Sequence, residues 1–512
     1  MVDENLQGNK IRLKLFVKQG WILMLVLLVA SFLRILNLGS VGFNSDEAVY
    51  AGQAAVLAGN EQLAKYFSIF RAHPLLFQFL VSIVYRFSFG DIQARIVAVT
   101  FAIATIYVTY LLGKVLYSKI AGLTAALFLS LMPYHVLVSR QALLDVPLAF
   151  ASVLSICFLA LFVVKREQCW FYLVGISIGI AALSKEVGIL LFPVALLSAA
   201  MARMLTFRNL IITSTLFILT FATYPLSIIL SGATPVSSSY LLWQFSRPPN
   251  HAPSYFFDIL VQYAGYPFLT LTIIGLTCVI IRRKVLDYVL LFSLVAPLVF
   301  FQLWPVKLFP YLLPLVPALV ILAGYGFVRL WRHSFHLRII GAVLILLTLS
   351  TFAYSSVPIS FYGANTTQNL FGEDVEVLSF AGVREAALWI RDNTPEDSIF
   401  MTITPSVANI VEFYSGRRAY ALSVSANPAN RNPEYAPIID PDLAIRVGVF
   451  DYILIDKYSE QRTSFYAQKI RDYVQKYHGI LVHATSVSYS HSLTDALHRS
   501  EERIWIYHIS QQ

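Results

Sequence analysis

The sequence of 512 residues is 57% hydrophobic and only 13% charged, and its mean hydropathy is +0.66. A soluble core needs far less apolar side chain, so a wholly soluble protein is excluded and most of the chain is expected to lie in a membrane. The formal net charge of +9 does not indicate nucleic-acid binding. The Lys and Arg residues lie in small groups between apolar runs, and they form no continuous basic face.

The first apolar run, residues 21–38, follows a basic amino terminus over residues 1–20 and has no small-residue cleavage site. It is therefore expected to stay as a membrane helix. About 20 residues cross the hydrocarbon core of a bilayer, and eleven apolar runs are candidate spans. They are residues 21–38, 96–113, 120–137, 147–164, 170–183, 188–202, 209–230, 258–281, 288–303, 308–328 and 339–357.

The charged residues between these runs predict how the chain is oriented in the membrane. Basic residues fall in alternate loops, at Lys114, Lys165, Arg203, Arg283 and Arg332. By the positive-inside rule these loops and the amino terminus face the cytoplasm, and eleven spans place the carboxy terminus outside. This alternation of basic loops requires residues 39–94 to form one external segment between two spans. Residues 73–89 are then not a span, and their apolar residues recur at the spacing of a helix that lies at the membrane interface.

From residue 358 the hydropathy falls and charged residues become frequent, which predicts a soluble domain over residues 358–512. Its apolar periodicity alternates between helix and strand. The predicted helices are residues 383–391 and 466–477, and the predicted strands are residues 398–404, 450–456 and 504–509. The expected architecture is a polytopic α-helical membrane domain over residues 21–357, followed by a small external α/β domain. A glycosylation sequon at Asn365 matters only in a compartment that glycosylates proteins.

Acidic residues are expected at two places on the outer face. Asp46 and Glu47 directly follow the first span, and Asp145 precedes a later one. One interpretation of the first pair is a helix start, with Asn44 or Ser45 as the cap and acids favoured by the helix dipole. Taken alone, Asp145 could be an ordinary charged residue of a loop. Carboxylates that face a common cavity can instead supply a general base or bind a divalent cation, for which Glu47 and Asp145 are the candidate ligands.

Basic side chains are expected at the same face. Each one alone is more often an interfacial side chain that reaches toward water. As a group they can bind phosphate, because Arg offers a bidentate fork and Lys a point charge. Lys185 is closely flanked by apolar sequence, so its burial would be costly without a function. The group comprises Arg71, His73, Arg95, Arg140, Lys185 and Lys307.

Five fragments occur in the order and spacing of a known family. They are DEAVYAGQA (46–54), HPLLF (73–77), GDIQARIVAV (90–99), SRQALLDVPLAF (139–150) and ALSKEVGILLFP (182–193). On these motifs the chain resembles the protein mannosyltransferase and aminoarabinose transferase group, which are polytopic glycosyltransferases of the C-type (GT-C) fold. The resemblance covers residues 1–205 and is diffuse thereafter.

The resemblance implies transfer of a sugar from a polyprenyl (dolichyl or undecaprenyl) phosphate carrier to an acceptor hydroxyl of a protein, lipid or glycan. The reaction would occur at the outer face of the plasma membrane, or in the endoplasmic reticulum of a eukaryote, with inversion at the anomeric carbon. By position, Asp46 matches the family's catalytic acid, Asp145 its second acidic site and Arg95 an arginine at the start of the second span. The donor phosphate would be bound by Arg95, Lys185, His73, Arg140 and Lys307.

The chain departs from the family pattern at two positions. One proline follows His73 where the family often has two, and Pro310 precedes Tyr311 where the family often has an arginine. Because the charge of His73 depends on pH, Lys185, Arg95 and Lys307 are alternative phosphate ligands. Apart from the divalent cation, no cofactor is implied. A transporter or lipid flippase without bond chemistry is the competing hypothesis, although the paired repeats common in transporters are not evident. A receptor whose external domain binds a partner is a third.

Overall fold

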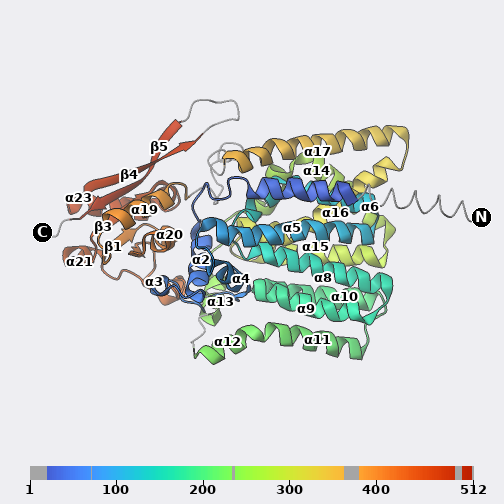
Figure 1. The fold of residues 1–512 in the computed structure, drawn as a ribbon, viewed down its shortest axis with the longest axis horizontal. Coiled ribbons are helices and arrows are strands. Elements are labelled where there is room, and N and C mark those ends of the chain that lie inside the picture. The colour runs from blue at the N-terminus through green and yellow to red at the C-terminus, as the bar shows by residue number, and fades with distance from the viewer. Residues whose placement is uncertain (1–19, 71, 233–236, 363–379, 490–498, 510–512) are drawn as a thin grey trace, which may run out of the picture.

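The computed structural model describes residues 20–70, 72–232, 237–362, 380–489 and 499–509. Figure 1 shows a bundle of long helices and, at one end of it, a domain that contains a β-sheet. The helices α2 (Ser45–Leu57), α3 (Glu61–Ala64), α4 (Leu76–Tyr85) and α13 (Ser237–Ser246) lie at the junction of the two. Arg71 and the sequon at Asn365 lie outside the described residues.

All eleven predicted spans are helical. Among the described residues, seven helices are long and apolar enough to cross a membrane, or eight if the bent pair α6–α7 counts as one span. The three others, Gly20–Ile35, α9 and η1–α10, are apolar but shorter. The bounds are Gly20–Ile35, α5 (Asp91–Leu116), α6 (Lys119–Leu131), α7 (Pro133–Ser139), α8 (Asp145–Lys165), α9 (Gln168–Ser184), η1 (Glu186–Leu190), α10 (Leu191–Met201), α11 (Phe207–Phe221), α12 (Thr223–Ser231), α14 (Tyr255–Arg282), α15 (Val285–Leu303), η2 (Phe309–Leu315), α16 (Val316–Trp331) and α17 (Phe335–Tyr362).

The predicted span over residues 120–137 is not one straight helix. It bends by 60° between α6 and α7. The bend is held by Arg34 of the first helix, which is fully buried and donates to the carbonyls of Ser130 at 3.0 Å and Leu129 at 3.2 Å. Pro133 begins α7, where its missing N–H costs no hydrogen bond. The guanidinium therefore satisfies carbonyls that the end of a helix leaves without partners.

Residues 73–89 contain a helix too short to span. α4 has 10 residues, which is about 15 Å and half the thickness of the hydrocarbon core. Its apolar residues Phe79 and Ile83 are exposed, while Gln78 and Ser82 are buried against the protein. Gln78 Nε2 donates to Gln53 Oε1 of α2 at 3.1 Å. The polar side of α4 thus faces the protein and its apolar side faces outward, which suits a helix at the membrane interface.

Most of the basic loops lie at one end of the bundle. The connections α8–α9, α10–α11, α14–α15 and α16–α17 lie at the end away from the sheet (Figure 1). They carry four of the five basic groups that predict the orientation, at Lys165, Arg203, Arg283 and Arg332. The segment 39–94 and the sheet domain both lie at the opposite end. The topology prediction assigns that end to the outside of the cell.

The carboxy-terminal domain contains a five-stranded sheet in the order β2-β1-β3-β5-β4. β1 pairs in parallel with β2 and β3, whereas β5 pairs antiparallel with β3 and β4. All predicted strands and helices of this domain are present, and β2, β4, α20, α21, α22 and the short helix η4 are additional. The bounds are β1 (Ile399–Thr402), β2 (Arg418–Ala421), β3 (Tyr452–Asp456), β4 (Ile480–Tyr489), β5 (Arg499–His508), α19 (Val383–Asn393), α20 (Pro405–Ser415), η4 (Pro428–Asn430), α21 (Pro441–Arg446), α22 (Lys457–Arg462) and α23 (Ser464–Lys476). The predicted fold class is confirmed.

The sheet domain docks onto the loop that leads into α2. The hydroxyl of Tyr414 in α20 accepts from Phe43 N at 2.8 Å and donates to Asp91 at 2.7 Å. Arg384 of α19 donates to the carbonyl of Gly39 at 2.8 Å and also pairs with Asp91. These contacts hold residues 39–44 in place, and Asp46 follows directly in the chain.

Candidate active site

A cavity of about 620 Å³ lies between the membrane helices and the sheet domain. From the membrane side it is lined by four residues predicted from the sequence: Asp46, His73, Asp145 and Lys185. From α13 and the sheet domain it is lined by polar and aromatic residues that the sequence did not single out, including Tyr240, Arg247, Arg431, Asn432, Tyr435 and Arg462. The arrangement brings acids, cations and hydroxyls around one space.

Asp46 and Glu47 begin α2 but point to different places. Asn44 Oδ1 accepts from Glu47 N at 2.9 Å, and Glu47 Oε2 accepts from Asn44 N at 3.1 Å, which is a capping box. The predicted helix start is therefore confirmed, with Asn44 as the cap. Successive side chains of a helix are about 100° apart. Asp46 consequently lines the cavity while Glu47 turns into the protein.

Glu47 and Arg95 form a buried pair away from the cavity. Arg95 Nε and Nη2 donate to the two carboxylate oxygens at 2.7 and 2.8 Å, and Glu47 is 1% exposed. A guanidinium has five N–H donors. The other three of Arg95 donate to backbone carbonyls, those of Leu38, Val41 and Gly42. Every donor of Arg95 is thus used inside the protein.

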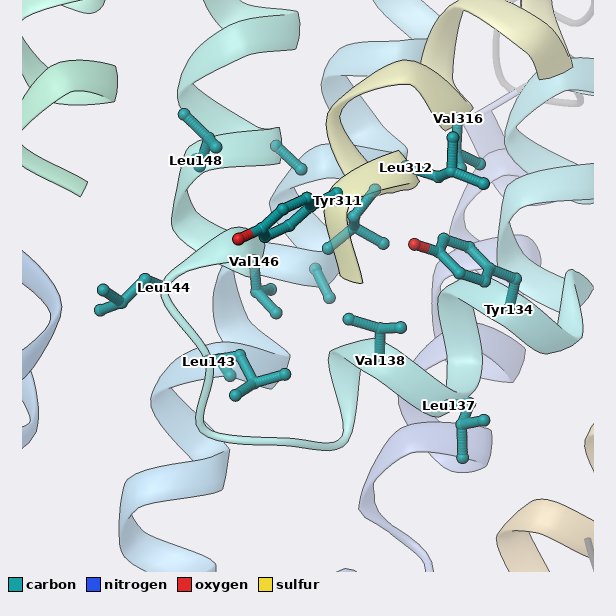
Figure 2. Packing of buried hydrophobic residues seen from close by; sticks show 14 of the residues in the cluster. Tyr134, Leu137, Val138, Leu143, Leu144, Val146, Leu148, Tyr311, Leu312 and Val316 are labelled. Atoms are coloured by element: carbon teal, nitrogen blue, oxygen red, sulfur yellow. The ribbon is translucent and has the colours of Figure 1, made fainter. Parts of the chain in front are cut away.

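Asp145 and Lys185 form a second buried pair, and this pair lines the cavity. Lys185 Nζ lies 2.9 and 3.0 Å from the two oxygens of Asp145. It also lies 4.5 Å from the centre of the Tyr311 ring. Figure 2 shows Tyr311 of η2 packed beside Val146, next to the loop that leads into α8. A buried ion pair is costly to desolvate, so its position beside a cavity points to a functional role.

A break between α9 and η1 positions Lys185. The residue has an extended backbone, with φ −160° and ψ 140°, and it ends α9. Gly188 N donates to the Lys185 carbonyl at 2.9 Å, which closes the turn. A Cβ on Gly188 would lie 2.4 Å from the backbone carbon of Ala181. Only glycine lets the chain fold back this closely.

His73 is paired with Glu186, the residue after Lys185. His73 Nδ1 lies 3.0 Å from each carboxylate oxygen of Glu186. The imidazole packs edge-on against Tyr240 at 5.5 Å and Tyr50 at 6.3 Å between ring centres. Burial raises the pKa of both tyrosines, so their hydroxyls stay protonated at neutral pH. Glu186 was not predicted as a site residue, although a Lys-Glu pair inside an apolar run was a signal for it.

Arg140 and Lys307 do not line the cavity. Arg140 donates to carbonyls at the end of the first helix and beyond it: Leu33, Leu36 and Asn37. Lys307 is buried, and its backbone N–H and carbonyl both bond to the side chain of Asn250. The structure therefore gathers four of the predicted site residues and places the other four elsewhere: Glu47, Arg95, Arg140 and Lys307.

The candidate metal ligands are each paired with a cation, Glu47 with Arg95 and Asp145 with Lys185. Within the described ranges, no group of three or more His, Cys, Asp or Glu residues comes together in a way that could hold a metal ion. The divalent cation stays a prediction from the sequence.

Comparison with known proteins adds independent information. The dolichyl-phosphate-mannose-protein mannosyltransferase family matches residues 72–229, a segment that contains His73, Asp145 and Lys185. No curated protein sequence matches the chain.

Among solved structures, the chain is similar to ArnT from Cupriavidus metallidurans in the apo state. The TM-score is 0.64 at 15% identity, covering 96% of this chain and 98% of that chain. It is similar to ArnT bound to undecaprenyl phosphate, with a TM-score of 0.62, 16% identity and coverage of 95% and 98%. It is also similar to the apo oligosaccharyltransferase of Archaeoglobus fulgidus, with a TM-score of 0.61, 14% identity and coverage of 95% and 76%.

Likeness to structures at such low identity establishes the fold, and function has to be argued from the site. Taken with the family match over residues 72–229, it confirms the resemblance predicted from the sequence. The chain is an integral membrane protein with the fold of the C-type glycosyltransferases, and it resembles those that use polyprenyl-phosphate sugars.

Proposed function

We propose that this protein transfers a sugar from a polyprenyl-phosphate carrier to an acceptor hydroxyl at the outer face of the membrane, with inversion. The observation that carries the proposal is the cavity that gathers Asp46, His73 and the Asp145–Lys185 pair at the junction of the helix bundle and the sheet domain. A donor carried by a lipid would reach such a site from the membrane. The solved ArnT structure with bound undecaprenyl phosphate supports a carrier of this chemical class.

Asp46 is the proposed general base. A hydroxyl is a weak nucleophile until a carboxylate takes its proton. As Asp46 accepts that proton, the acceptor oxygen bonds to the anomeric carbon of the sugar. The bond from the anomeric carbon to the phosphate oxygen breaks, and its electron pair remains on the phosphate. Attack opposite the leaving phosphate inverts the anomeric carbon.

Lys185 and His73 are the proposed partners of the leaving phosphate. Cations near a leaving phosphate stabilise the charge that develops on it, most strongly where water is excluded. Asp145 holds the Lys185 ammonium in place through two contacts. Arg95 is given another role, because its five N–H donors are occupied by Glu47 and by backbone carbonyls. It holds the start of α2, and thereby the position of Asp46.

The acceptor is proposed to enter from the side of the sheet domain. There the cavity is lined by side chains that can bond to hydroxyls, among them Ser423, Asn432 and Tyr435. Solved structures of the Archaeoglobus fulgidus oligosaccharyltransferase include a complex with an inhibitory peptide and a dolichol-phosphate, and one tethered to an acceptor peptide. They support a peptide as the first class of acceptor to try, with lipid and glycan acceptors next.

The experiment incubates the purified protein with radiolabelled polyprenyl-phosphate sugars and a panel of acceptors. Asp46→Asn keeps the shape of the side chain but cannot take a proton, so transfer should fall by about 10²- to 10⁴-fold while donor affinity is kept. Asp397→Asn, at an exposed position of the sheet domain, is the matched control. Near-normal turnover in Asp46→Asn would remove it as the base. Movement of the carrier across vesicles without a new glycosidic bond would favour a flippase.

A further inference from the structure

We propose that the hydroxyl of Tyr240 donates a hydrogen bond to the phosphate of the donor, and that Gln244 and Arg247 orient this hydroxyl. The role rests on the proposed function, and it belongs to side chains outside the sequence motifs discussed above. It predicts that reversing one hydrogen bond beside Tyr240 weakens the binding of the carrier phosphate, even though Tyr240 itself is kept.

One face of α13 lines the cavity. Tyr240 and Gln244 are one helical turn apart, and Arg247 directly follows the last residue of the helix, so all three lie on the same side. Trp243 lies beside them and also lines the cavity. Figure 1 shows α13 at the junction of the bundle and the sheet domain. The side chains of this face can therefore contact a molecule that is bound in the cavity.

Three side chains on this face form a chain of hydrogen bonds. Arg247 Nη1 donates to Gln244 Oε1 at 3.1 Å, and Gln244 Nε2 donates to the hydroxyl oxygen of Tyr240 at 2.6 Å. The guanidinium carbon of Arg247 lies 4.8 Å from the centre of the Trp243 ring, a cation–π contact that holds the charge in place. The chain of bonds therefore starts from a fixed cation and ends at Tyr240.

The direction of these bonds is set by chemistry. A guanidinium has only donors, so the atom of Gln244 that faces Arg247 has to be its carbonyl oxygen. The amide nitrogen of Gln244 then faces Tyr240, and the hydroxyl oxygen of Tyr240 accepts from it. Among the described residues, this is the one hydrogen bond that the Tyr240 hydroxyl makes. Its own hydrogen is left to donate to a ligand.

The charged groups around the cavity favour an anion as that ligand. Among the described residues that line the cavity, the carboxylates are Asp46 and Asp145, and the cations are Lys185, Arg247, Arg431 and Arg462, joined by His73 when it is protonated. Positive charge exceeds negative charge even with a neutral imidazole. A cavity with this balance attracts a phosphate.

The Tyr240 hydroxyl lies near the proposed phosphate partner. It interacts electrostatically with Asp46 and with Lys185, the residue proposed to stabilise the leaving phosphate. Burial raises the pKa of Tyr240, so the hydroxyl keeps its hydrogen at neutral pH. The ring packs edge-on against His73, with 5.5 Å between the ring centres, which limits its movement. An O–H donor held in this way can stabilise the negative charge that develops on the leaving phosphate.

The test measures the affinity of the full-length protein for undecaprenyl phosphate and for undecaprenol, which lacks the phosphate. A hydrogen bond to a charged group corresponds to about a 10- to 100-fold change in affinity. Tyr240→Phe should therefore weaken the binding of undecaprenyl phosphate by about this factor and leave the binding of undecaprenol unchanged. Tyr266→Phe removes a hydroxyl from a residue of α14 that is 72% exposed, and as the matched control it should change neither affinity.

Gln244→Glu tests the orientation of the hydroxyl. An ionised carboxylate only accepts hydrogen bonds, so it would accept from Arg247 on one side and from the Tyr240 hydroxyl on the other. The hydrogen of Tyr240 would then point away from the phosphate, and affinity should fall by about 10-fold or more although Tyr240 is kept. In the Tyr240→Phe background no hydroxyl is left to be turned, so Gln244→Glu should cause little further loss.

Unchanged affinity for undecaprenyl phosphate in Tyr240→Phe would overturn the proposal. A full additional loss from Gln244→Glu in the Tyr240→Phe background would do the same, because it would show charge repulsion rather than orientation. Loss of affinity for both lipids together with a lower unfolding midpoint would make Tyr240 a structural residue only. If the wild type binds undecaprenyl phosphate but transfers no sugar from any polyprenyl-phosphate donor, the proposed function fails separately, and these binding comparisons still decide the role of Tyr240.

Discussion

Replacing Arg95 by alanine is expected to destabilise the fold rather than to act on the donor phosphate. The change leaves the Glu47 carboxylate buried, at 1% exposure, without its cation. Breaking a buried ion pair in this way costs about 3 to 5 kcal/mol. The carbonyls of Leu38, Val41 and Gly42 lose their donor as well, at about 1 to 3 kcal/mol for each one that stays dry. These costs are not additive, so we expect Arg95→Ala to lower the free energy of unfolding by about 3 to 5 kcal/mol.

The assay compares the unfolding midpoint of the purified protein in one detergent with its affinity for undecaprenyl phosphate. Arg95→Ala should unfold at a markedly lower midpoint. The double variant Arg95→Met with Glu47→Gln should recover part of the loss, because no charge is then left unpaired. Arg391→Ala removes an exposed arginine of the sheet domain and should change stability by less than about 0.5 kcal/mol. A variant Arg95→Ala with wild-type stability and lost carrier affinity would refute this reasoning and make Arg95 a phosphate ligand.

Three further outcomes are expected. Lys185→Met should weaken the affinity for the carrier by about 10-fold or more, measured by carrier binding. It should also lower stability, because Asp145 is left unpaired; adding Asp145→Asn should restore the stability but not the affinity. Burial raises the pKa of Asp456 from 3.8 to about 6, so the folded domain binds more protons than the unfolded chain and its stability falls by about 2 kcal/mol as pH rises from about 4 to about 6. Asp456→Asn should abolish this loss in melting curves. With the three native cysteines replaced, Lys284→Cys and Ile439→Cys should react with an impermeant maleimide from opposite sides of the membrane, and labelling from the same side would contradict the topology.

Much of the membrane domain was predictable because a bilayer constrains sequence strongly. A span needs a long apolar run, and all eleven such runs are helical. The cap at Asn44 was equally local, since a capping box involves residues three apart. Asp46, Asp145 and Lys185 could be brought to one face because the alternation of basic loops orders the ends of the helices.

The partners of the charged residues were not predictable. The motif around Arg95 gave its position in the chain but not its contacts, three of which are backbone carbonyls that any sequence supplies. The outer wall of the cavity depends on contacts between distant segments, such as Asn409 with Ser45, 364 residues apart. No local pattern encodes such pairing. The same holds for the bend after α6, which requires a guanidinium from another helix.

That guanidinium also bears on how the protein is made. Arg34 enters the membrane in the first helix, yet Leu129 and Ser130, whose carbonyls it binds, come about 95 residues later. At about 5 to 20 residues per second, translation leaves Arg34 without these partners for roughly 5 to 20 seconds. Its place near the end of the helix Gly20–Ile35 lets the side chain reach lipid headgroups in the meantime. The first helix can therefore be inserted early, but it packs in its final position only after α6 has been synthesised.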